Sequence, residues 1–193
     1  MIDEELAEDL REYIRTAVRS GYDDPAEIPE EAAENVDSED DPEVLDLAER
    51  ILAEESAALA AEQAGWPAVT DCDRIDAAFA ALDAAGVVAR AHFTCCGTCA
   101  NAEIGAELAD HPAPRGFVYH HIQDTDHAVA GGGLMLGYGT VADGEEAVAA
   151  IGEEVVAALR VQGFEPKWNG SAQTRIEVPM TWQRRVPAGS HAG

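Results

Sequence analysis

Apolar residues recur every three or four positions along the N-terminal part of the chain, which is the spacing of amphipathic helices. Asp41 can cap one of these helices, and Pro42 would occupy its first position, where proline is favoured. The prolines and the acidic run of residues 22–41 favour a loop with at most a short helical turn. The predicted helices cover residues 3–19, Asp41 to about Gly65, and Thr70 or Asp71 to Gly86.

From residue 87 onward, short apolar runs alternate with helical spacing. Asn169-Gly170 is a pair that favours tight turns between antiparallel strands. Asp143 and Glu146 have the spacing of a capping box at the start of a long helix. The predicted strands are 87–93, 116–122, 134–141, 164–168 and 174–182, and the predicted helices are 100–108 and 143–163.

The order of these elements predicts an α+β fold. Strand, helix, strand, strand, helix and strand in succession match the split βαβ (ferredoxin-like) order, a mainly antiparallel sheet with both helices on one face. The earlier helices would form an N-terminal helical extension. We therefore expect an acidic helical extension over 1–65, an α+β core domain over 66–186 and a flexible tail over 187–193.

Charge narrows the choice of partners. The 38 acidic residues outnumber the 12 basic residues, which gives a formal net charge of −26. Such a field repels the phosphates of nucleic acids and anionic membrane surfaces, so we expect neither as a partner, and the partner stays an unknown protein or small molecule. Most of this charge is expected to serve solvation of the surface.

Cellular location follows from the same patterns. The sequence has no apolar run of the length that spans a membrane, and its first residues are acidic instead of basic and then apolar as in a signal peptide. We therefore expect a cytoplasmic protein. Thiols stay reduced in that compartment, so the four cysteines are interpreted as free thiols, metal ligands or a redox pair.

The strongest chemical signal is the run Phe93-Thr94-Cys95-Cys96-Gly97-Thr98-Cys99, between a predicted strand and a predicted helix. The two-residue gap between Cys96 and Cys99 lets both sulfurs reach one ion, and Cys95 is a possible third ligand. A tetrahedral zinc needs a fourth ligand. The candidates are His120 or His121, of which at most one can face the site because neighbours on a strand point to opposite faces, together with His92 and Cys72.

Thiol redox chemistry is the alternative interpretation. Thioredoxin-like proteins also place Cys-x-x-Cys after a strand and at a helix start, where Cys96 would be the attacking thiolate and Cys99 its resolving partner. Full membership of that fold is not expected, because residues 123–133 look too short and too rich in glycine for the additional helix it needs. A third interpretation is that small cysteines only fill a crowded corner of the core.

Several segments together resemble a known family. They are Trp66, Asp71 to Phe79, the Phe-Thr-Cys-Cys-x-x-Cys run, Ala102-Glu103-Ile104, Gln123-Asp124-Thr125 and Gly131 to Leu134. With these residues the chain is similar, from about its first helix to Arg185, to an uncharacterised bacterial family known as a domain of unknown function. The resemblance implies a soluble single-domain protein and carries over no activity, ligand or catalytic residue.

The sequence thus leads to two functional hypotheses. The first is a binding or regulatory protein, without a catalytic signature, in which Cys95, Cys96 and Cys99 hold zinc and His120 or His121 completes the site. The second is a thiol oxidoreductase or redox sensor that uses Cys96 and Cys99.

Overall fold

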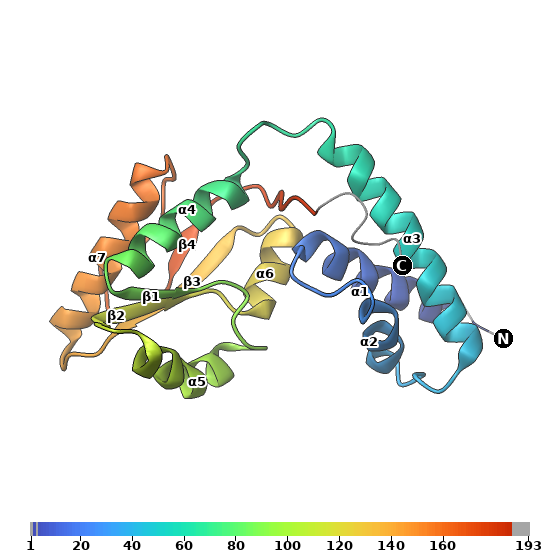
Figure 1. Ribbon diagram of the computed structural model, residues 1–193, viewed down its shortest axis with the longest axis horizontal. Helices are drawn as coiled ribbons and strands as arrows, with labels where there is room; N and C mark the ends of the chain where they lie inside the picture. Colours follow the sequence, from blue (N-terminus) through green and yellow to red (C-terminus); the bar gives the residue numbers. More distant parts are fainter. Residues whose placement is uncertain (1, 3, 187–193) are drawn as a thin grey trace. The chain divides into compact units, whose positions relative to one another are not determined.

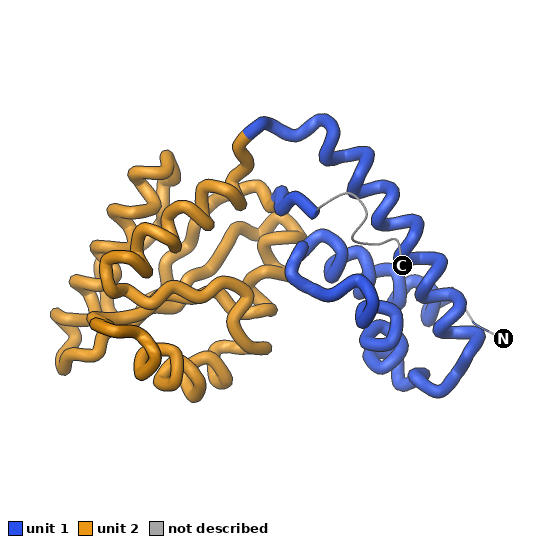
Figure 2. The backbone as a smooth tube through the Cα atoms, in the orientation of Figure 1, with its two compact units in different colours: residues 1–68, 183–193 blue, residues 69–182 orange. Residues whose placement is uncertain are grey.

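The chain forms two compact units. The computed structural model describes residue 2 and residues 4–186, so the predicted tail over 187–193 lies outside the described residues. Unit 1 contains the described residues up to Ala68 together with residues 183–186, and unit 2 runs from Val69 to Trp182 (Figure 2). The chain therefore leaves unit 1 once, builds unit 2 and returns.

Unit 1 is built from three helices, α1 (Glu4–Ser20), α2 (Ile28–Asn35) and α3 (Pro42–Gln63). Asp41 caps α3 as predicted, because its side chain accepts a hydrogen bond from the Glu43 amide. The helix α2 corrects the expectation of a loop over 22–41. Its Pro29 lies in the first turn, where the missing amide hydrogen costs nothing. The apolar face of α2 is buried in the unit through Ile28, Ala32 and Ala33.

One carboxylate joins α1 to α3 in unit 1. Glu55 of α3 is 6% exposed and receives hydrogen bonds from three arginines that are spaced four residues apart on α1. Arg15 and Arg19 approach it to 3.1 Å, and Arg11 approaches it to 3.4 Å. These positions lie along one stripe of the helix, so all three basic residues of α1 contact a single buried carboxylate.

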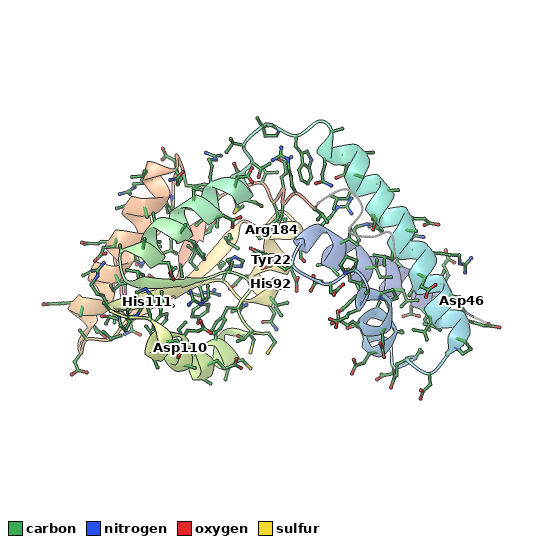
Figure 3. All side chains as sticks on the ribbon, in the orientation of Figure 1. Tyr22, Asp46, His92, Asp110, His111 and Arg184 are labelled. Atoms are coloured by element: carbon green, nitrogen blue, oxygen red, sulfur yellow. The ribbon has the colours of Figure 1, made fainter. Side chains whose placement is uncertain are left out.

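The returning segment closes unit 1. The Arg184 guanidinium lies over the ring of Tyr22, 4.3 Å from its centroid (Figure 3). The amide of Val186 donates to the side-chain oxygen of Gln63 at 2.9 Å. A cation over an aromatic ring and a backbone hydrogen bond thus hold this segment against the helices.

Unit 2 contains a four-stranded sheet and four helices in the described residues. The strands lie in the order β1-β2-β3-β4, with β1 and β2 parallel and the other two pairs antiparallel. The elements are α4 (Asp71–Ala84), β1 (Val87–Arg90), α5 (Gly97–Asp110), β2 (Gly116–Tyr119), α6 (Ile122–Val129), β3 (Leu134–Thr140), α7 (Glu145–Val161) and β4 (Ile176–Val178).

The α+β class, the mainly antiparallel sheet and the N-terminal helices are confirmed, but the strand order differs from the split βαβ order. In that order another strand separates the two parallel ones, whereas β1 and β2 pair directly here. The segment predicted as a strand over 164–168 makes only an isolated bridge, from Lys167 to Glu177. Lys167 and Glu177 exchange both backbone hydrogen bonds, so the next bonded pair of this ladder would join Glu165 to residue 179, and Pro179 has no amide hydrogen to donate.

Helices cover both faces of this sheet. Apolar side chains of α4 and α7 pack with residues of all four strands into one core, which includes Phe79, Val118, Leu136 and Val155. The helix α5 lies along the opposite face (Figure 1). The connection that carries the cysteines therefore crosses from the end of β1 to that second face.

Two local expectations are corrected in unit 2. The long helix α7 begins after Gly144, whose φ of 100° favours glycine, and no side chain caps it, so Asp143 and Glu146 form no capping box. Residues 123–133 do contain a helix, because His121 and Asp124 form a capping box that starts α6 directly after β2.

Candidate metal and thiol site

The cysteine run lies in a constrained loop between β1 and α5. His92 and Thr94 have positive φ angles of 52° and 57°, which residues other than glycine seldom adopt. The loop is held in this shape from outside: the Phe93 amide donates to the His120 carbonyl at 2.9 Å, and the Ile122 amide donates to the Thr94 carbonyl at 3.0 Å. Strain that neighbouring structure maintains is typical of functional sites.

The three sulfurs of the loop converge. The Sγ atoms of Cys95, Cys96 and Cys99 all lie within 4.8 Å of one another, and those of Cys95 and Cys99 are 3.2 Å apart. The side chains are accessible, since Cys95 is exposed and the other two are half-buried. Packing into the core is thus not their role, and a group of this kind could hold a metal ion.

The start of α5 separates the acidities of the thiols. Cys96 is the residue before the first turn, and interaction with the Cys99 and Thr98 amides lowers the pKa of Cys96. Hydrogen bonds with Cys95 and Cys96 raise the pKa of Cys99 to about 12. Cys96 is therefore a stronger acid than Cys99.

A buried ionic group lies beside this helix start. His121 follows β2, and a Cβ atom added to Gly97 would lie 3.7 Å from its Nε2. The Nδ1 atom accepts the Asp124 amide hydrogen, and Nε2 lies 3.2 Å from the Asp124 carboxylate. Arg175 donates to both oxygens of this carboxylate, to Oδ1 at 2.9 Å. Burial lowers the pKa of His121, so its ring is neutral at neutral pH.

The other candidate ligands face elsewhere. His120 is fully buried, and its ring lies 5.9 Å from the Phe79 ring and 6.0 Å from the Trp182 ring, on the side of the α4 core. His92 contacts the Thr125 hydroxyl through Nδ1 at 3.0 Å. Cys72 is buried in α4. Within the described part of the chain, the group that could share an ion contains the three loop sulfurs, so the histidine ligand stays a prediction.

Tyr119 packs between His121 and the helix α5. Its hydroxyl donates to Asn101 of α5 at 3.2 Å, and its ring lies 6.4 Å from the ring of His121. Burial raises the pKa of Tyr119. A Cβ atom on Gly137 would lie only 2.7 Å from the Tyr119 ring, so the glycine of β3 lets the ring lie flat on the sheet.

Sequence reasoning singled out the three cysteines and named His120 and His121 as candidate ligands, but it did not predict the pairing of Asp124 with Arg175. The spacing His121-x-x-Asp124 is a capping signal that could have revealed the first of these two residues. Arg175 lies 51 residues away from its partner, and no local pattern announces such a pairing.

Chemically, the arrangement offers three sulfurs at the surface with one stabilised thiolate among them. Soft metal ions prefer such donors, and an activated thiolate next to a second thiol also suits redox exchange.

A helix long and apolar enough to cross a membrane does not occur among the described residues.

The comparisons with known proteins give one match. A family model described as a domain of unknown function (DUF6891) matches residues 3–186. No curated protein and no solved structure matches the chain.

Proposed function

The chain belongs to the family of the domain of unknown function DUF6891, and from this premise we propose that it is a binding or regulatory protein in which Cys95, Cys96 and Cys99 hold a zinc ion. The convergence of the three sulfurs within 4.8 Å carries this proposal. Zinc has no geometric preference from its d electrons and binds thiolates at about 2.3 Å, so three sulfurs that already lie close together suit it as ligands.

The surroundings support a thiolate site. The backbone amides at the start of α5 stabilise the Cys96 thiolate, and ligand sulfurs must lose their protons to bind metal. The strained loop fixes Cys95 and Cys96 before binding, which reduces the entropy lost when the ion is bound. Cytoplasmic location and an acidic surface that avoids nucleic acid and membranes belong to the same proposal, with a protein or a small molecule as partner.

Elemental analysis tests the zinc site. We expect the full chain, purified without added metal, to contain about one zinc per molecule, and Cys99→Ser to weaken binding by about 100-fold or more. Cys72→Ala is the matched control, because it removes a thiol outside the cluster and should leave zinc binding unchanged. A folded wild-type protein that neither contains zinc nor takes it up would end the proposal.

A redox function is the second candidate, and the separated acidities of Cys96 and Cys99 favour it. Oxidation by a peroxide would convert the two thiols into a disulfide, with the peroxide reduced to water or an alcohol and water. We expect the metal-free protein to be alkylated fastest at Cys96. Alkylation of Cys96 at the rate of an ordinary thiol, with no disulfide after mild oxidation, would exclude this function.

A further inference from the structure

We propose that the fourth position on an ion held by Cys95, Cys96 and Cys99 is filled from outside the chain, by the sulfur of a small thiol. This inference rests on the zinc-binding function proposed above and identifies the class of ligand that such a site would take.

Both ring nitrogens of His121 lie close to Asp124. Its Nδ1 accepts the Asp124 amide hydrogen at 3.2 Å, so the neutral ring carries its proton on Nε2. That Nε2 lies 3.2 Å from the Asp124 carboxylate, which Arg175 also holds. Both ring nitrogens are therefore engaged, and neither offers a lone pair to a metal. Ligation by His121 would break the capping box that starts α6.

The exposure of the cluster is the second argument. Cys95 is exposed, whereas Cys72 and His120 are buried in or against the α4 core. As far as the described residues extend, three sulfurs form the complete ligand group. An ion bound there would be accessible to a ligand from solvent, as in zinc sites that bind substrates.

The charge of the ligand set points to a thiol. Three thiolates outweigh the two positive charges of zinc, so the ion polarises a bound water only weakly and accepts a soft sulfur donor readily. In the binding step, the thiol sulfur bonds to zinc, water leaves the ion, and the S–H proton goes to solvent. The added negative charge would lie at the amino end of α5, where the helix dipole favours it.

Cobalt(II) in place of zinc makes this step visible. The full chain is reduced with a phosphine, loaded with cobalt and titrated with 2-mercaptoethanol, and ethylene glycol serves as the control in which oxygen replaces sulfur. We expect the sulfur-to-cobalt charge-transfer absorption to rise by about one third and to saturate at about one thiol per cobalt, since three sulfur ligands become four. His121→Gln should show the same titration.

Each other outcome is decisive. An unchanged spectrum with cobalt still bound, or removal of cobalt by the thiol, would overturn the open position. If the cobalt spectrum of His121→Gln differed from that of the wild type before thiol is added, His121 and not an external thiol would be the fourth ligand. Failure of the untreated wild-type chain to bind cobalt or zinc at all would instead refute the metal site itself, and it is recognised before any thiol is added.

Discussion

Among the described residues, each unit of this protein buries one carboxylate side chain that arginine holds, and the two carboxylates have different surroundings. In unit 1, Glu55 lies between α1 and α3 and is held by Arg11, Arg15 and Arg19. In unit 2, Asp124 is held by Arg175 and by the backbone and ring of His121, next to the start of α5. Both charges are paired, as buried charges must be.

The difference lies in what surrounds each pair. Glu55 is enclosed by helices whose apolar residues form a plain core, so its arginines serve to align α1 with α3. Asp124 lies among groups that can ligate metals or transfer protons, and it fixes the ring of His121 beside Gly97. The same ion pairing thus stabilises helix packing in one unit and organises a candidate site in the other.

The largest effect is expected from Asp124→Ala. The change leaves Arg175 and the His121 amide without their buried acceptor, and we expect a loss of about 3 kcal/mol in the free energy of unfolding. Urea unfolding measures it. Asp143→Ala, at an exposed position, is the control and should cost less than about 0.5 kcal/mol. Equal free energies of unfolding for the two variants would mean that the contacts of Asp124 do not stabilise the fold.

Glu55→Gln should cost somewhat less, about 2 kcal/mol. The amide keeps an acceptor oxygen but loses the charge that three arginines share, and those arginines can turn partly toward solvent. The neighbouring Glu54→Gln removes only an exposed ion pair with Arg11, so we expect about 0.5 kcal/mol or less there. If both variants lost the same stability in urea unfolding, burial of Glu55 would have no special role.

Acid should remove the advantage of the wild type over Glu55→Gln. Burial alone would raise the pKa of Glu55, but the hydrogen bonds of Arg15, Arg19 and Arg11 outweigh it and hold this pKa below the ordinary value of 4.5. The stabilisation is therefore complete above pH 4.5 and is lost as the pH falls through the lowered pKa. Unfolding measured at neutral pH and again in acid should show the gap closing, and a constant gap would contradict the assignment.

The smallest effect is expected from Gly97→Ala. The new Cβ atom would lie 3.7 Å from Nε2 of His121, an ordinary contact, and Gly97 is not among the glycines with positive φ. Alanine in a helix is favoured over glycine by about 1 kcal/mol or less, so stability should stay equal or rise slightly. Zinc binding, followed by elemental analysis, should be unchanged. A clear loss of bound zinc would show that His121 must approach the cysteines more closely.

Much of the fold was predictable from local signals. Asp41 with Pro42, and Thr70 or Asp71, were the predicted helix starts, and such capping depends on a few neighbouring residues. The structure confirms both starts, with Asp41 and Thr70 as the caps. The helix α2 was not expected, because Pro29 is tolerated in a first helical turn. The strand expected over 164–168 does not form, because Pro179 cannot donate the next hydrogen bond of its ladder. One residue type thus has opposite consequences at the two positions.

The candidate site was predictable only where its residues are adjacent in sequence. The spacing of Cys95, Cys96 and Cys99 sufficed to bring their sulfurs together, since a helix start places them on one short turn. His120 points toward the core and His121 toward α5, as expected for neighbours in an extended segment, whose side chains point to opposite sides. The alternation alone does not say which of the two histidines points toward α5.

By itself the sequence determined the helices with strong caps, the short apolar strand segments, the acidic charge and the cluster of three thiols. All of these depend on composition or on contacts over a few residues. Only the tertiary structure decided the strand order, the return of residues 183–186 to unit 1, and the pairing of Arg175 with Asp124 beside the thiols. These features join segments that are far apart along the chain. The free energy that stabilises these long-range contacts comes from burial and charge pairing, which exist only once the sheet has assembled.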